Sequence, residues 1–481
     1  MAHRIARGSF WSLAGASLAF AAACGGDDGG ESTDPVSTGN LPAQFTVTIE
    51  NVTPEPTALS AGRFSTVAGT AENRAIGPGE QYELTVKAPP LGRLSIVSML
   101  VPSNDYFLST DPVEGMPLFV ERTGQPLQGV VSDVFKVYDL GTEENQPLGD
   151  GSTQANNLVG QGQEDTNIGL RDMDTTIREA VDTRLPAVAD MIELELQPNQ
   201  TEADETTTFT VILRNISTAT TLTIDSGTRD VRFSPGAWAV HNPEQTNVFF
   251  TLGQADVGAG MENLAEDGRP AAISNMVAAG SGIRTSFAPG AYAVYTGANP
   301  IYTAGGTATI DLELLAEDGV IDQMVMALAA EDGVEASGGF DIPVGTTASG
   351  PIGPGESYSF SFTAKADAAS KLSFASMYTP SNDIFVSTAT GGFSLFETRV
   401  DETGVDALFP VANGEITNLA LWDAGTEVNQ EPGYGADQPD RQIGQNRGET
   451  ENGTVGGVFD GFNYPTTASM LKVSFTAVTV Q

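Results

Sequence analysis

Short runs of alternating apolar and polar residues recur along most of the chain, and each run predicts a β-strand with one buried face. Such alternation occupies residues 45–49, 82–86 and 192–196. Residues 94–101 form a nearly continuous apolar run, which predicts a central strand buried on both faces. Long helical periodicity is nearly absent, although residues 321–330 could form one short helix. The pattern therefore predicts an all-β protein of many short strands joined by turns.

The strand pattern restarts after a polar linker at residues 197–206, which is a natural domain boundary. An Ile-Gly-Pro-Gly-Glu turn at 76–80 returns at 352–356, and the strands around it return with it. Because these elements recur in the same order, we expect two tandem copies of one domain. Their predicted boundaries are 41–197 and 207–481.

The second predicted copy is longer because it contains an insert near 225–340, and this insert is itself duplicated. Phe-Ser-Pro-Gly-Ala-Trp-Ala-Val-His at 233–241 returns as Phe-Ala-Pro-Gly-Ala-Tyr-Ala-Val-Tyr at 287–295. Leu-Ala-Glu-Asp-Gly at 264–268 returns unchanged at 315–319.

The composition suits strands and turns and speaks against one class of partner. Glycine (54 residues) and proline (27 residues) are plentiful, as turn-rich folds require. The formal net charge is −40, which argues against a surface that neutralises nucleic-acid phosphates. An acidic surface instead suits solubility, cation binding or a salty exterior.

Cysteine and histidine are too rare for several kinds of site. With a single cysteine, no intrachain disulfide can form. Only His3 and His241 are histidines, and His3 lies in the leader, so a Ser-His-Asp triad or a multi-histidine metal site would depend on His241. Tyr295 replaces it in the second insert unit, which favours a packed histidine at the rim over a catalytic one.

Residues 1–24 are typical of a bacterial lipoprotein signal peptide. Arginines precede an apolar stretch at 10–23 that is too short to span a bilayer. Small residues directly before Cys24 resemble a lipobox, so we expect lipidation of Cys24; an ordinary secretory signal is the alternative. Residues 25–40 form a predicted flexible tether. The protein is thus expected in the bacterial cell envelope, surface-exposed on the outer membrane or secreted, with membrane contact only through its lipid.

Two acidic stretches occur twice in the same order and carry the candidate chemistry. Ser-Asn-Asp ends at residue 105 and again at 383, each time after an apolar strand. Asp-x-Gly-Thr-Glu follows at 139–143 and again at 423–427. The candidate ligands are the carboxylates of Asp105, Asp139 and Glu143 in the first copy and of Asp383, Asp423 and Glu427 in the second.

These residue types suit a hard divalent cation. The glycine inside Asp-x-Gly-Thr-Glu allows a tight turn that can point both carboxylates inward. Calcium takes about six to eight oxygen ligands, and three carboxylates held together without a cation would repel one another. The alternative is that these residues only form turns and strand ends, as the repeated Gly-Pro-Gly-Glu segment does.

The motifs resemble the spondin N-terminal domain, a family best known from F-spondin and its relatives. The resemblance rests on Ser-x-Asp and on Leu-Trp-Asp-Ala-Gly-Thr-Glu at 421–427, together with Phe-Ser-Pro-Gly and Ala-Glu-Asp-Gly as in bacterial members. It covers most of 41–197 and 207–480. The first copy departs from the pattern, because it has Val-Tyr-Asp-Leu at this point and its Phe-x-Pro-Gly segment is missing or reduced to 58–70.

The resemblance implies an antiparallel β-sandwich in each copy and one calcium ion at a loop end. It implies that the metal ligands are Asp383, Asp423 and Glu427, and in the first copy Asp105, Asp139 and Glu143. Glutamate stands at the last position, where the animal members have the shorter aspartate. Those animal members are secreted matrix and adhesion proteins.

We therefore expect a non-enzymatic, calcium-binding surface lipoprotein that contacts a surface, matrix or polysaccharide ligand. Linked domains suit such binding because weak sites gain avidity when joined. One alternative is a hydrolase that uses paired carboxylates as acid and base, although no separate activated nucleophile or histidine is visible. Another is a purely structural envelope protein. The weaker motif of the first copy predicts weaker calcium binding there than in the second.

Overall fold

The fold is all-β, as the strand pattern predicts, and it consists of antiparallel sheets with a few short helices. The computed structural model describes residues 39–480 except for gaps at 153, 155–174, 202–205, 257–259 and 443. The predicted signal peptide 1–24 with Cys24, and nearly all of the predicted tether 25–40, lie outside the described residues. Among the described helices, none is long and apolar enough to cross a membrane.

Residues 57–282 form one β-sandwich, which we call the inserted domain. Its four-stranded sheet has the order β3 (Gln81–Ala88), β11 (Thr207–Asn215), β10 (Ile192–Thr201) and β7 (Gly129–Val130). Its seven-stranded sheet has the order β2 (Ser60–Phe64), β14 (Phe233–His241), β4 (Arg93–Leu100), β5 (Tyr106–Ser109), β8 (Lys136–Asp139) and β9 (Arg178–Glu179), with β6 (Met116–Pro117) beside β4. The hairpin β12 (Leu222–Ile224) and β13 (Gly227–Arg229) and the 3-10 turns η1 (Ser132–Val134) and η2 (Val188–Asp190) complete it.

Residues 39–52 and 285–480 form a second β-sandwich, which we call the split domain. Its four-stranded sheet has the order β17 (Ser357–Ala364), β1 (Ala43–Asn51), β26 (Leu471–Thr479) and β23 (Gly414–Glu415). Its seven-stranded sheet has the order β16 (Val334–Phe340), β15 (Phe287–Tyr295), β18 (Lys371–Tyr378), β19 (Ile384–Thr388), β24 (Leu419–Asp423) and β25 (Gly456–Gly457), with β20 (Phe393–Ser394) beside β18. The hairpin β21 (Phe396–Val400) and β22 (Asp406–Pro410) extends from it.

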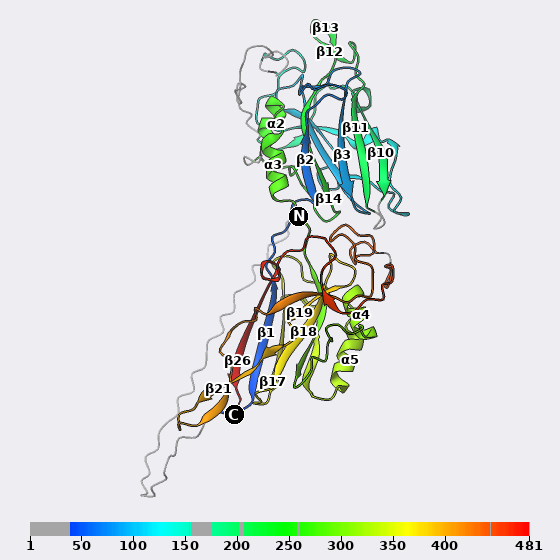
Figure 1. The fold of residues 1–481 in the computed structure, drawn as a ribbon. Helices are drawn as coiled ribbons and strands as arrows, with labels where there is room; N and C mark the ends of the chain where they lie inside the picture. The colour runs from blue at the N-terminus through cyan, green and yellow to red at the C-terminus, as the bar shows by residue number, and fades with distance from the viewer. Residues whose placement is uncertain are drawn as a thin grey trace, which may run out of the picture.

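Two helices pack on the seven-stranded sheet of each domain, so each domain has three layers (Figure 1). They are α2 (Met261–Asp267) and α3 (Ala271–Ala279) in the inserted domain, and α4 (Ile310–Asp318) and α5 (Asp322–Ala330) in the split domain, where α6 (Thr467–Met470) is a further single turn. The predicted short helix is confirmed as α5. The repeated Ala-Glu-Asp-Gly segment ends α2 and α4, because Gly268 (φ 67°) and Gly319 (φ 65°) take the left-handed conformation that caps a helix.

The strand pairing corrects the predicted domain boundaries. β1 lies between β17 and β26, with Phe45 opposite Phe362 on one side and Ala477 on the other, so it belongs to the split domain. β11 takes the matching place in the inserted domain, between β3 and β10. The division into 41–197 and 207–481 therefore assigns both strands to the wrong domain. In the sequence, the inserted domain lies between the first two strands of the split domain, β1 and β15.

The duplicated insert near 225–340 is corrected in the same way. Its first half, with β14, pairs with β2 and β4 in the inserted domain. Its second half, with β15, pairs with β16 and β18 in the split domain. Each domain thus has one Phe-x-Pro-Gly strand followed by two helices, and none is missing. The two copies share one fold, but the inserted domain is circularly permuted relative to the split domain.

A buried asparagine at the end of β1 and another at the end of β11 form hydrogen bonds that hold these two strands in their domains. In the inserted domain, the Asn215 amide donates to the carbonyl oxygens of Ile76 and Val231. In the split domain, the Asn51 amide donates to the carbonyl oxygens of Thr285 and Ile352. Both partners at 76 and 352 open the repeated Gly-Pro-Gly-Glu turn, so each strand is joined to the turn of its own domain.

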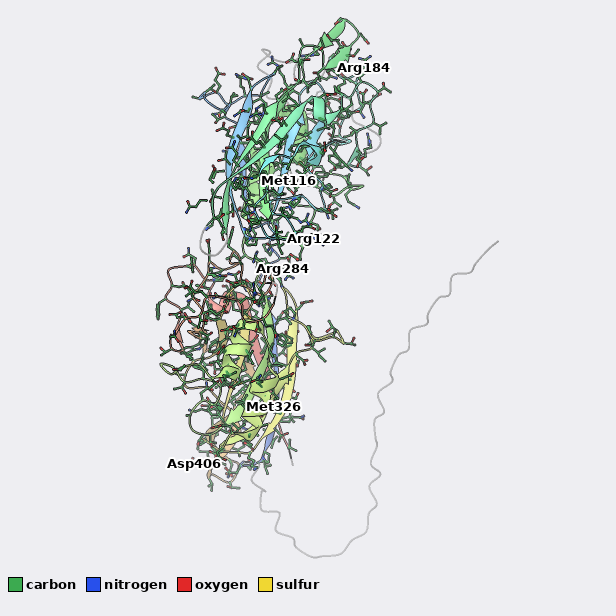
Figure 2. All side chains as sticks on the ribbon, turned by 90° about the vertical axis from the view of Figure 1, so that its right-hand side faces the viewer. Met116, Arg122, Arg184, Arg284, Met326 and Asp406 are labelled. Atoms are coloured by element: carbon green, nitrogen blue, oxygen red, sulfur yellow. The ribbon has the colours of Figure 1, made fainter. Side chains whose placement is uncertain are left out.

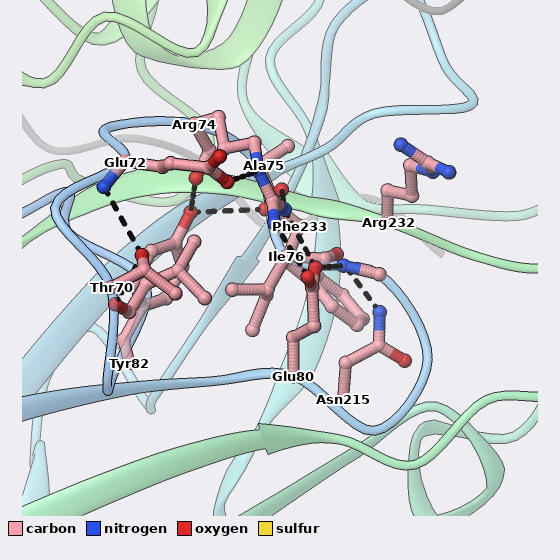
Figure 3. A network of polar contacts seen from close by, with 12 residues as sticks. Thr70, Glu72, Arg74, Ala75, Ile76, Glu80, Tyr82, Asn215, Arg232 and Phe233 are labelled. Carbon is pink, nitrogen blue, oxygen red and sulfur yellow. Dashed lines mark hydrogen bonds and ion pairs between the residues drawn. The ribbon is translucent and has the colours of Figure 1, made fainter.

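Figure 3 shows this turn in the inserted domain. The Glu80 carboxylate accepts a hydrogen bond from the Gly77 N–H at 2.7 Å and forms an ion pair with Arg74 at 2.6 Å. The Arg74 guanidinium holds the pKa of Glu80 below its usual range. Glu356 accepts the matching bond from the Gly353 N–H in the split domain. The repeated turn is therefore structural.

Substitution of the two asparagines should destabilise different domains. Asn51→Ala leaves the Thr285 and Ile352 carbonyls without their donor, so we expect a loss of about 2–3 kcal/mol confined to the split domain. Asn215→Ala is the matched variant for the inserted domain. Scanning calorimetry of both variants tests this prediction. The fragment 57–282, measured beside them, identifies the unfolding transition of the inserted domain. A shift of that transition by Asn51→Ala would contradict the strand exchange.

Candidate functional site

The sheet register brings the two acidic stretches of each domain together. Asp105 directly precedes β5 and Asp139 ends β8, and these neighbouring strands pair with Tyr106 opposite Asp139. In the split domain, Ile384 stands opposite Asp423 in the same arrangement. All six predicted ligands are buried or half-buried at these loop ends, three in each domain.

The serine and asparagine of Ser-Asn-Asp shape the loop around the aspartate. The hydroxyls of Ser103 and Ser381 accept a hydrogen bond from the backbone N–H three residues later, which closes the turn. The amide of Asn382 donates to the Val428 carbonyl at 2.8 Å and accepts from the Gln430 N–H. Asn104 makes the equivalent bonds in the inserted domain. The motif therefore joins two loops as well as presenting a carboxylate.

The aspartate of Ser-Asn-Asp has one satisfied oxygen and one unsatisfied oxygen. Asp383 Oδ2 accepts the N–H groups of Thr426 and Glu427, and Asp105 Oδ2 accepts those of residues 141–143. The Oδ1 atoms of both aspartates are buried and have no hydrogen-bond partner. Burial raises the pKa of Asp383 to about 7 and that of Asp105 to about 8. A buried oxygen of this kind favours a proton or a cation beside it.

The first aspartate of Asp-x-Gly-Thr-Glu is held by its own loop. Asp423 Oδ1 accepts the Gly425 N–H at 2.7 Å, and Oδ2 accepts the side-chain amide of Asn429. Gly425 has a φ of 68°, and a Cβ there would lie 2.7 Å from the Thr454 nitrogen, so only glycine fits. Asn145 makes the same bond to Asp139. The repetition of both asparagines at one spacing is visible in the sequence, but sequence reasoning gave neither of them a role in holding the aspartate.

The two sites differ at one position across the sheet edge. Arg178 stands opposite Asp139 in β9, and its guanidinium lies 2.8 Å from Asp139 Oδ2. The position opposite Asp423 in β25 is Gly456. The inserted domain therefore places its own cation against the acidic loop, whereas the split domain has no side chain there.

A further carboxylate joins the site of the split domain from α4. Glu317 is buried, and its pKa is raised to about 7 by burial and by the nearby Glu427 charge. Glu427 has its pKa raised to about 7 as well, and its Oε1 accepts the Gly448 N–H at 2.7 Å. Sequence reasoning noted the repeated Ala-Glu-Asp-Gly segment but gave Glu317 no part in the site. A cavity of about 320 Å³ opens beside Gly425 and Thr426.

The residue types and the burial of the acidic loops suit a hard cation, but the present positions of their side chains do not form a metal site. The partnerless Asp383 Oδ1 and the gathered carboxylates are what such an ion would satisfy. As the side chains stand, however, no group of three or more His, Cys, Asp or Glu among the described residues is placed to hold a metal. Binding would therefore need the loop oxygens to turn from backbone N–H groups toward the ion.

His241 is packed, as expected, but inside the inserted domain rather than at a rim. It is 1% exposed, and its Nε2 lies 3.0 Å from Ser95 Oγ, while Nδ1 bonds the Asn242 carbonyl. Burial lowers the pKa of His241. Ser95 is also buried, so this pair has no access to a substrate.

No family model matches the chain, and no curated protein matches it either.

Proposed function

We propose that the protein is a non-enzymatic, calcium-binding adhesion or matrix-contact lipoprotein of the bacterial cell surface. The observation that carries this proposal is the buried, partnerless Asp383 Oδ1 at a loop end where further carboxylates gather. The same pair of loops recurs in the inserted domain. This repetition supports a functional role for the loops over the alternative that they only form turns. Two linked domains would allow weak contacts to add.

In this proposal the calcium site of the split domain is held by Asp383, Asp423 and Glu427. Glu317 would add charge from α4, and loop carbonyls and water would complete the oxygen shell. Asp105, Asp139 and Glu143 form the matching site, which Arg178 weakens because its positive charge already lies against Asp139. Both domains are proposed to be spondin-like, and the anchor is proposed to be the lipid on Cys24.

Calcium should stabilise the split domain. At about a hundred times its dissociation constant, an ion that binds only the folded state adds roughly 2.7 kcal/mol. We expect the melting temperature of residues 41–481 to rise with calcium more than with magnesium, and Asp423→Asn to remove this rise. Thermal unfolding with each ion and with chelator measures it. An unchanged melting temperature in calcium would reduce the acidic loops to turns and leave a purely structural protein.

The pH dependence gives an internal control. In the metal-free protein the pKa of Asp383 is about 7, above the value of about 3.9 that aspartate has when unfolded. The folded state therefore binds more protons between these values, so its stability should fall as the pH rises from about 4 to 7. Calcium competes with that proton, and its stabilising effect should be larger at pH 8 than at pH 5.

A further inference from the structure

A cavity of about 250 Å³ lies between the two domains, and it contains none of the candidate calcium ligands. Its walls include Arg122 of the inserted domain and Arg441 and Arg447 of the split domain. Figure 2 labels Arg122 at this junction. The chain has 22 Lys and Arg against 62 Asp and Glu, whereas the walls of this cavity carry three arginines against two acidic residues, Glu121 and Asp437.

Arg441 is the buried cation of this cavity. Arg441 is 9% exposed. Its Nη2 donates a hydrogen bond to Asn242 Oδ1 of the inserted domain at 2.8 Å. Its Nε is buried without a hydrogen-bond partner. The charges of Asp440 and Glu244 act on it through space, but no ion pair joins either to Arg441 among the described residues. A buried guanidinium donor without an acceptor calls for an oxygen from outside the chain.

The other two arginines stand at the rim and are available to a ligand. Arg122 and Arg447 are exposed, and neither has an ion-pair partner among the residues that the structure describes. The acidic residues of the same walls each accept a side-chain hydrogen bond from another residue. Glu121 accepts from Arg93 at 3.3 Å, and Asp437 accepts from the Gln430 amide at 2.6 Å. Each carboxylate keeps further lone pairs, so the preference of the cavity for an oxyanion depends on three guanidinium groups outnumbering two carboxylates.

The shape and lining indicate the chemical class of the ligand. Guanidinium groups offer planar pairs of N–H donors that match the oxygens of carboxylates and sulfates. The volume is more than one oxyanion needs and lies just below the ~300–1,000 Å³ of pockets for drug-sized ligands, which suits a single ring. Pro90 and Leu91 supply an apolar wall for the face of such a ring.

We propose that the cavity between the domains binds an acidic sugar residue, a ring that carries a carboxylate or a sulfate. Its oxyanion lies against Arg441, and Arg122 and Arg447 close on it from opposite domains. The site needs no calcium. Its biological role rests on the proposed adhesion function, for which it names the ligand class, but its chemistry stands apart from the acidic loops.

Calorimetry on residues 25–481, which lack the predicted signal peptide and Cys24, tests this with trigalacturonate, a sulfated galactose trisaccharide and neutral galactotriose. We expect at least one acidic sugar to bind, and the neutral sugar to bind at least about tenfold more weakly. Arg122→Ala combined with Arg447→Ala should weaken acidic-sugar binding by about tenfold or more. Neither rim residue has an ion-pair partner among the described residues, so the fold should be kept. Whether the carboxylate or the sulfate form binds better identifies the source of the oxyanion.

Arg399→Ala is the matched control, because Arg399 lies on the β21–β22 hairpin, whose Asp406 Figure 2 places at the far end of the split domain. It should leave affinity unchanged. Equal binding of acidic and neutral sugars, no binding at millimolar concentration, or full affinity in the double arginine variant overturns the proposal. If chelator or Asp423→Asn abolishes sugar binding while the double arginine variant keeps it, the sugar binds at the acidic loops instead. Arginine-dependent binding without any calcium response supports the cavity and overturns only the calcium site.

Discussion

Removal of residues 1–52 is expected to unfold the split domain while the inserted domain stays folded. Phe45, Val47 and Ile49 of β1 are each at most 1% exposed in the core of the split domain. Burial of such side chains contributes about 1.5–3 kcal/mol each, so their loss approaches the ~5–15 kcal/mol that stabilises a whole domain. β17 and β26 also lose the strand that lies between them.

Hydrogen exchange of the shortened chain measures this result. Amides of β17 and β26 should lose protection, whereas those of β3 and β10 should keep it. A peptide of residues 41–52 added in trans should restore protection, because it supplies the missing strand. Removal of residues 1–38 alone is the matched control and should change neither domain. Cooperative folding of an isolated fragment 41–197 would contradict the exchange of β1.

Reciprocal substitutions at the sheet edge are expected to exchange the calcium responses of the two domains. Arg178→Gly should strengthen calcium binding in the inserted domain, because it removes the guanidinium that lies 2.8 Å from Asp139. Gly456→Arg should weaken calcium binding in the split domain by roughly tenfold or more, since like charges about 4 Å apart cost a few kcal/mol near a protein surface. The backbone at 456 is not left-handed, and the nearest atom to a Cβ there is 3.6 Å away, so a side chain fits.

Calorimetric titration with calcium, read beside the unfolding of each domain, compares these variants. Arg178→Lys keeps a positive charge and should bind calcium as weakly as the unmodified inserted domain. Gly456→Ala adds a Cβ without charge and should bind as the unmodified protein does. If Gly456→Arg bound calcium with full affinity, the ion would have to lie elsewhere than beside Asp423.

The strands themselves are determined by local sequence. Alternation at 45–49 and 82–86 and the apolar run at 94–101 specify which side chains face a core, and the structure confirms these strands as β1, β3 and β4. Repetition of Ser-Asn-Asp and Asp-x-Gly-Thr-Glu also sufficed to select the candidate carboxylates. Short helices such as α2 escaped prediction because seven residues show little periodicity, and sheet packing decides them.

Which domain each strand completes was decided only by tertiary structure. β1 and β11 carry nearly the same apolar pattern, so either could fill either core. β10 ends at Thr201 and β11 begins at Thr207, and these two residues pair, so the two strands close at a lower entropy cost than any distant pairing. β1 is then left for the matching place in the split domain.

The sequence determined the residue types of this protein's sites but not their neighbours. It named Asp139 and Asp423, yet Arg178 comes close to Asp139 only through the register of β8 and β9. Glu317 approaches Glu427 from a helix more than a hundred residues earlier in the chain, and the arginine cavity exists only where two domains meet. Periodicity and motif spacing record what one segment prefers locally, whereas sheet register and domain contact depend on segments far apart in the chain.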